Sequence, residues 1–120
     1  MVTDFANSIE LVRFAQNEGL FTSLTDQLSK DFQRANLSFE TAEDVGPEAF
    51  VARLNARVDG ILQTRFSAFQ NLVYLIDIPE KTMKDIKGSN RSEMIGQTVL
   101  VMLKRTWQKV WIRHLHANKN

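Results

Sequence analysis

The chain contains no cysteine. This absence excludes disulfide bonds, thiolate nucleophiles, iron–sulfur clusters and zinc sites built on cysteine, and it fits a reducing compartment. No apolar run exceeds five residues, as at Val99–Leu103, whereas a membrane-spanning helix needs about 18 to 20. The first 20 residues have no basic leader and are interrupted by Asp4, Glu10 and Arg13, so no secretory signal is predicted. We therefore expect a cytoplasmic protein with no membrane span.

Catalytic signatures are missing as well. The sequence contains none of the patterns GxxxxGKS/T, GxGxxG, HExxH and GxSxG, which mark phosphate, dinucleotide, zinc-protease and hydrolase sites. The two histidines, His114 and His116, would point about 200° apart on a helix, so they cannot bind one metal ion together. We predict no catalytic residue, no cofactor and no metal site, and hence a protein that is not an enzyme.

Turn-forming residues are scarce, because the chain has only two prolines and five glycines among its 120 residues. Long helices are therefore expected, and the length suits one domain over residues 1–120. Apolar residues at three- and four-residue spacing indicate where the helices lie. The expected fold is all-α, an antiparallel bundle of four main helices plus one short helix. The predicted helices run from after Thr3 or Asp4 to Asn17, over Leu20–Ala35, over Pro47–Ile76, over Pro79–Ile86 (the short one), and from Arg91 onward.

The third predicted helix, Pro47–Ile76, is too long for the expected domain. Thirty residues would span ~45 Å, whereas a compact chain of this length would be only ~35 Å across. The helix either kinks, with Gly60 as the obvious place, or projects into a partner, which favours a dimer. Arg65 is the one polar residue in its apolar stripe. Its side chain either extends to solvent along the apolar surface, pairs with Asp59 or an acid of another helix, or lines a ligand cleft.

Capping patterns precede the last two predicted helices. Residues Asp77–Glu80 and Asn90–Glu93 each place an Asx residue three positions before a glutamate, which is the spacing of a capping box. In such a box the first side chain accepts from the backbone N–H of the glutamate. We expect both segments to start helices in this way.

The last predicted helix carries a wide apolar surface that includes Trp107 and Trp111. One turn apart, these side chains are typical of core or dimer-interface anchors. Arg105, Lys109 and Arg113 follow one line down the same helix at four-residue spacing. This basic column either contacts phosphates of a nucleic acid, with a tryptophan stacked on a base, or complements the negative end of the helix dipole.

Charge is divided unevenly between the two halves of the chain, although the net charge is only +1. Residues 1–60 carry five basic and ten acidic side chains, a net of −5, and residues 61–120 carry ten basic and four acidic ones, a net of +6. The basic half either faces an acidic partner or packs beside the acidic half inside one bundle.

The segment NLVYLIDIPEKTMK, followed about twenty residues later by LKRTWQKVWIR, resembles a family of small uncharacterised all-helical proteins of bacteria. The resemblance covers roughly the C-terminal half of the chain. It implies an all-helical fold and carries no implication for chemistry. The matching residues are Tyr74, Ile76, Asp77, Glu80, Gln108, Lys109 and Arg113.

Taken with the missing signatures, the apolar stripes predict a non-enzymatic helical protein that acts through protein–protein contact as a homodimer. The third and last helices would supply the interface, and an unknown protein partner is also possible. The alternative is a nucleic-acid-binding module that uses the basic column of Arg105, Lys109 and Arg113. The expected interface anchors are Phe66, Phe69, Trp107 and Trp111.

Overall fold

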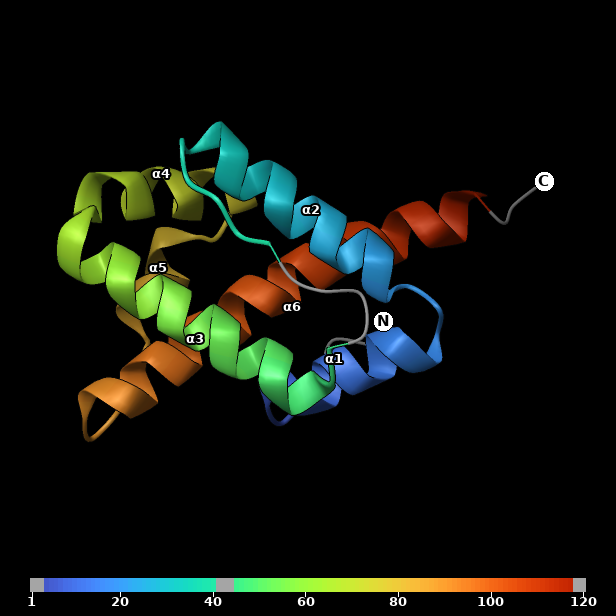
Figure 1. Ribbon diagram of the computed structural model, residues 1–120, viewed down its shortest axis with the longest axis horizontal. Helices are drawn as coiled ribbons and strands as arrows, with labels where there is room; N and C mark the ends of the chain where they lie inside the picture. The colour runs from blue at the N-terminus through green and yellow to red at the C-terminus, as the bar shows by residue number, and fades with distance from the viewer. Residues whose placement is uncertain (1–3, 41–44, 118–120) are drawn as a thin grey trace.

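The computed structural model describes residues 4–40 and 45–117. Over these ranges the chain folds into six packed helices without any strand, and the all-α prediction is confirmed (Figure 1). Five of the predicted helix starts and ends move, and one predicted helix becomes two. The helices are α1 (Ser8–Asn17), α2 (Phe21–Arg34), α3 (Pro47–Thr64), α4 (Phe66–Ile76), α5 (Glu80–Lys84) and α6 (Arg91–Ala117).

Helix α1 begins later than its apolar pattern predicts, because Asn7 caps it. The Asn7 Oδ1 atom accepts from the Glu10 backbone N–H at 2.9 Å, and Glu10 Oε2 accepts from the N–H of Ala6 at 2.9 Å. Helix α1 ends at Asn17 as predicted, and Gly19 beyond it adopts a positive φ of 70°. Asn36, with φ 61°, ends α2 in the same left-handed conformation.

The long helix predicted over Pro47–Ile76 is broken at Arg65. Its backbone, at φ −143° and ψ 55°, leaves the helical region, so α3 ends at Thr64 and α4 starts at Phe66. The two helices pack against each other, and Figure 1 shows α4 turning back above α3. The expected kink at Gly60 is wrong, because Gly60 stays inside α3. The break resolves the length mismatch within one chain.

Only the second of the two predicted capping boxes forms. Asp77 ends α4 with φ 71° instead of starting α5, whose first residues have no side-chain cap. Asn90 Oδ1 does accept from the Glu93 N–H at 2.9 Å, and Glu93 in turn accepts from Ser89. The backbone N–H of Ser89 and, second, its hydroxyl lower the pKa of Glu93 below its ordinary value of 4.5.

Helix α6 is the central element of the fold. Its 27 residues span about 40 Å, close to the longest dimension of the molecule, 44 Å. It packs against α1, α2, α3 and α4, which surround it in Figure 1. The buried residues of all these helices form one continuous apolar core. Over the described part of the chain, no helix is long and apolar enough to cross a membrane.

Candidate functional site

The two tryptophans of α6 belong to the core of a single chain. Trp107 has no exposed surface, and Trp111 is half-buried beside it with ring centroids 5.6 Å apart. Phe14 of α1 packs edge-on against Trp107 at 5.8 Å and also contacts Trp111. Trp107 is therefore a core residue and not an interface anchor, because α1 and its neighbours cover the apolar stripe that carries it.

The basic column of α6 is largely engaged inside the chain, and its first member is Arg105. The guanidinium donates from Nη2 to Asp77 Oδ2 at 2.7 Å and from Nε to the Asp77 carbonyl oxygen at 3.2 Å. Its Nη1 atom donates to Gln108 Oε1 at 2.8 Å. Arg105 thus holds the C-terminal end of α4, where a positive charge complements the helix dipole.

Lys109, the second basic residue, reaches the same end of α4. Its ammonium donates to the Leu75 carbonyl oxygen at 3.2 Å and lies 3.9 Å from Asp31 Oδ2. Asp31 is only 1% exposed, and its other oxygen accepts from Gln27 at 3.2 Å. Because a buried carboxylate is costly without a cation nearby, Lys109 joins α2, α4 and α6 electrostatically.

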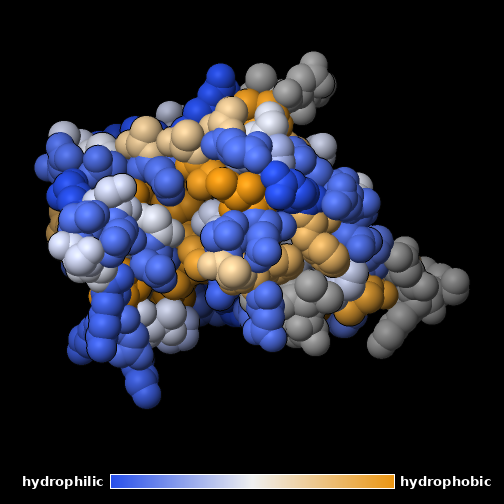
Figure 2. Space-filling view, turned by 90° about the horizontal axis from the view of Figure 1, so that it is seen from below, coloured by the Kyte–Doolittle hydropathy of each residue, from blue (hydrophilic) through white to orange (hydrophobic). Residues whose placement is uncertain are grey.

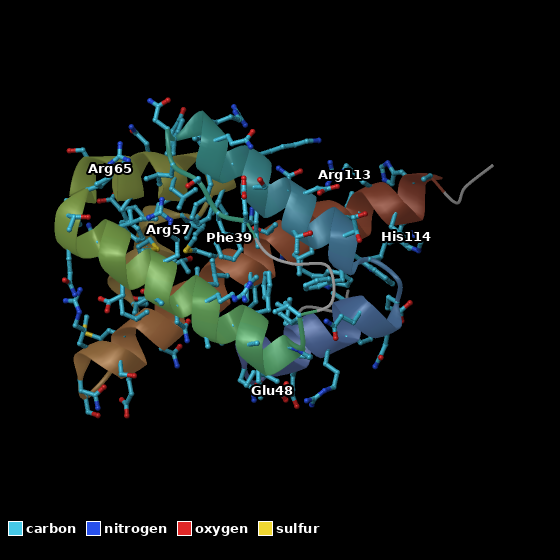
Figure 3. The ribbon with its side chains drawn as sticks, viewed as in Figure 1. Phe39, Glu48, Arg57, Arg65, Arg113 and His114 are labelled. Atoms are coloured by element: carbon cyan, nitrogen blue, oxygen red, sulfur yellow. The ribbon has the colours of Figure 1, made fainter. Side chains whose placement is uncertain are left out.

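Arg113, the third basic residue, is exposed and forms no recorded ion pair with any described residue. It lies on the last turns of α6, far in Figure 3 from Arg65 at the α3–α4 break. His114 is half-buried against Trp111, with ring centroids 5.6 Å apart. The three basic residues therefore do not face solvent as one column, since two of them are turned toward α4.

An open apolar groove lies between α4 and α5, and we call it the α4–α5 groove. It encloses about 410 Å³. Phe66 is 55% exposed and Tyr74 82% exposed, the two largest exposures among the big apolar side chains of the described residues. Polar side chains enter its lining only at Gln70 and Glu80. The apolar residues that line it are Phe66, Phe69, Val73, Tyr74, Ile78 and Met83.

The sequence produces this groove by placing two apolar stripes on α4. Phe69, Leu72 and Ile76 are buried and fix α4 to the core. Phe66 and Tyr74 lie on an adjacent stripe that the chain leaves uncovered. Phe66 stacks on Phe69 with ring centroids 6.3 Å apart, so the exposed stripe packs against a buried side chain of the core.

Of the four predicted interface anchors, Phe66 and Phe69 line the α4–α5 groove, Phe66 exposed and Phe69 as its buried floor. Sequence reasoning missed Tyr74 and Met83. The spacing of Tyr74 from Phe66 could have identified it as an interface residue. It follows Phe66 by eight residues, with Gln70 midway, which places all three on one side of a helix.

Contrary to the sequence prediction, Arg65 does not lie in the apolar stripe of a continuous helix. It is exposed at the break, and its expected partner Asp59 is paired instead with Arg91 of α6, whose Nε donates to Asp59 Oδ1 at 2.7 Å. Arg65 forms no recorded ion pair within the described ranges. It stands beside Phe66, at the N-terminal end of the groove's exposed stripe.

Another hollow lies between α1, α3 and α6. Figure 2 shows the molecule from below, with apolar residues in the middle and hydrophilic ones around them. The hollow holds about 340 Å³ and mixes Val51 and Leu100 with Asn55, Lys87 and Glu93. Its mixed lining differs from that of the α4–α5 groove, whose exposed surface is mainly apolar.

Comparison with known proteins adds no further assignment, because no family model, curated protein or solved structure matches the chain. The resemblance of the C-terminal half to small helical bacterial proteins thus rests on its residues alone. Among residues 4–40 and 45–117, no three histidine or acidic side chains gather in a way that could hold a metal ion.

Proposed function

We propose that this protein acts through protein–protein contact, and that its contact surface is the α4–α5 groove, filled by a second copy of the chain. The observation that carries the proposal is the exposure of Phe66 and Tyr74 beside a largely apolar groove. Contiguous exposed apolar patches mark interaction sites, whereas apolar side chains exposed singly do not, and aromatic side chains supply much of the energy of interfaces.

Self-association is favoured because the same surface supplies both the projecting groups and the groove that can receive them. Phe66 and Tyr74 project, while Phe69, Val73 and Met83 line the space between α4 and α5. The net charge of +1 means that two copies repel each other only weakly. The charged residues at the two ends of α4, Arg65 and Asp77, have opposite signs.

The expected dimer is a weak one. A buried aromatic side chain covers ~150–250 Å², so the exposed parts of Phe66 and Tyr74 in two copies supply on the order of half of the ~1,200 Å² found in the smallest stable interfaces. Neighbouring side chains and Met83 supply the remaining interface area. We therefore expect a Kd of about 10–100 μM.

The basic column of α6 supports nucleic-acid contact less well than the α4–α5 groove supports self-association. Arg105 and Lys109 have their charged groups on Asp77, Leu75 and Asp31, so phosphate contact would have to compete with these bonds. The salt dependence of any binding would expose such contact, since affinity for phosphates falls steeply as salt rises.

Sedimentation equilibrium over a concentration series tests the proposal. The wild-type chain is expected to pass from monomer to dimer, and Tyr74→Ser is expected to weaken the dimer by about tenfold or more, as for a central aromatic anchor. Leu115→Ser is the matched control, because Leu115 is also an exposed apolar residue, 46% exposed, but lies on α6 outside the groove. A wild-type chain that stays monomeric to about 1 mM, or equal effects of the two substitutions, would overturn the proposal.

A further inference from the structure

We infer that α4 pairs antiparallel with α4 of the second copy, about a two-fold axis that passes Gln70. This inference rests on the proposed function and adds to it the geometry of the contact. It follows from three properties of α4: the spacing of its exposed aromatics, the shape of the groove beside them, and the charges at its two ends.

The spacing of the exposed aromatics is symmetric about Gln70. Phe66 precedes Gln70 by four residues and Tyr74 follows it by four, so all three lie on one side of the helix. In a two-fold contact, a residue that touches a second residue of the partner is touched by the same residue in return. An antiparallel pair centred on Gln70 therefore sets Phe66 of each copy against Tyr74 of the other.

The groove gives this pairing a place for the most exposed side chain. Tyr74 is 82% exposed, whereas Phe66 is partly held by its stack on Phe69. In the antiparallel arrangement the ring of Tyr74 from one copy packs beside the Phe66–Phe69 stack of the other. Its hydroxyl can remain at the wet rim, as tyrosine at interfaces commonly does.

The charges at the ends of α4 favour the same orientation. Arg65 is exposed at the N-terminal end, and the carboxylate of Asp77 is exposed at the C-terminal end, where Arg105 and Lys109 of the same chain already complement the helix dipole. Antiparallel pairing brings the Arg65 end of each copy to the Asp77 end of the other. Parallel pairing would set Arg65 against Arg65. Because Asp77 already binds Arg105 in its own chain, this complementarity selects the orientation more than it adds affinity.

Disulfide trapping tests the axis directly, since the natural chain has no cysteine to interfere. A disulfide forms only where the two Cα atoms come within about 7 Å. The variant Gln70→Cys places its thiol on the axis and is expected to cross-link efficiently under mild oxidation. Glu18→Cys, at an exposed position between α1 and α2, is the control and is expected to cross-link only at the rate of random collision.

Mixing two further variants tests the orientation. In the antiparallel pair, Phe66→Cys in one copy faces Tyr74→Cys in the other, while two like thiols would be about 12 Å apart along the axis. The mixture is therefore expected to yield the mixed disulfide, at least fivefold over either like disulfide. Each mixed dimer keeps one intact aromatic contact, and circular dichroism of the reduced variants verifies that they are folded.

The outcomes of these experiments distinguish the antiparallel pairing from the proposed self-association. A dimeric wild-type chain with the mixed disulfide dominant supports both. A dimeric wild-type chain that yields mainly like disulfides, or no Gln70→Cys cross-link above the Glu18→Cys control, overturns the antiparallel pairing and leaves self-association standing. A wild-type chain that remains monomeric overturns the proposed function, and the pairing with it.

Discussion

The ammonium of Lys109 lies 3.9 Å from Oδ2 of Asp31, a carboxylate oxygen that accepts no hydrogen bond from any described residue. Asp31 is 1% exposed, and the guanidinium of Arg34 is also 3.9 Å away, at Oδ1. A buried carboxylate with such long contacts depends on the nearby positive charge rather than on ideal geometry. Lys109 is thus a structural residue of the α2–α4–α6 junction.

Removing the positive charge at this junction is expected to destabilise the fold. The variant Lys109→Met leaves the buried Asp31 with only the exposed guanidinium of Arg34 nearby, 3.9 Å from Oδ1. We expect the free energy of unfolding to fall by about 2–4 kcal/mol. Arg113→Met, on the same helix but exposed and unpaired among the described residues, is expected to change it by less than about 0.5 kcal/mol. Urea unfolding measures both. If the two variants lose the same stability, Lys109 has no special role.

A double variant identifies the cause of that loss. Asp31→Asn combined with Lys109→Met removes both charges while keeping the shape of the acid. It is expected to regain about half or more of the stability lost in Lys109→Met, because no uncompensated charge then remains buried. A double variant as stable as Lys109→Met, with nothing regained, would show that the loss comes from the Lys109 bond to Leu75 instead.

Because Asp77 ends α4 in a left-handed conformation, we expect its alanine and glycine variants to differ in stability. With φ 71°, a side chain with a Cβ is strained there by about 1–2 kcal/mol, and Asp and Asn tolerate the conformation better than Ala. Asp77→Ala is expected to lower the free energy of unfolding by about 1–2 kcal/mol, and Asp77→Gly by less, since glycine removes the strain although the Arg105 bond is lost. Thermal unfolding compares the two. Equal losses would mean that the Arg105 contact alone matters.

Two glycines are expected to respond in opposite directions to alanine. A Cβ at Gly60, inside α3, would meet no atom within 4 Å, so Gly60→Ala should stabilise the protein by about 0.5–1 kcal/mol through helix propensity. A Cβ at Gly88 would lie 2.8 Å from the Met94 backbone nitrogen and 2.9 Å from Glu93 Cβ. Gly88→Ala should therefore destabilise the start of α6 by about 1–3 kcal/mol. Chemical denaturation measures both, and a stabilising Gly88→Ala would contradict this packing.

The position of the tryptophans predicts a spectroscopic result. Trp107 is fully buried and Trp111 half-buried within one chain, so the tryptophan emission maximum should stay constant while the protein is diluted from dimer to monomer. A Trp111→Phe variant isolates the signal of Trp107, which should resist quenching by acrylamide at every concentration. An emission shift that follows the change in mass would return the tryptophans to the interface.

How far the fold could be predicted differs between its parts. The ends of α1 and α2 at Gly19 and Asn36 were readable, because residues that tolerate a positive φ stop helices locally. The break at Arg65 was not, because the apolar periodicity continues through it and no glycine or proline marks the place. Packing of α4 onto α3 decides that break, and periodicity in one chain segment contains no information about it.

The two capping patterns also differ in whether the sequence alone predicts them. Asn90 and Glu93 cap α6 as their spacing predicts. The first pattern has the same spacing, yet Asp77 turns left-handed and bonds Arg105, 28 residues away. A cap competes with any charged partner that the fold brings close, and only the tertiary structure determines which interaction forms.

The sequence by itself determined the all-α class, the single continuous core, the approximate helices and the presence of more apolar surface than one helix face needs. These depend on short-range spacing and on composition, which are independent of how the helices are arranged. Only the tertiary structure decided which apolar stripe stays exposed and which cations stay free. It buried Trp107, turned Arg105 and Lys109 toward α4, and left Phe66 and Tyr74 uncovered. Burial and pairing depend on contacts between segments far apart in the chain, and such contacts exist only once the helices have packed.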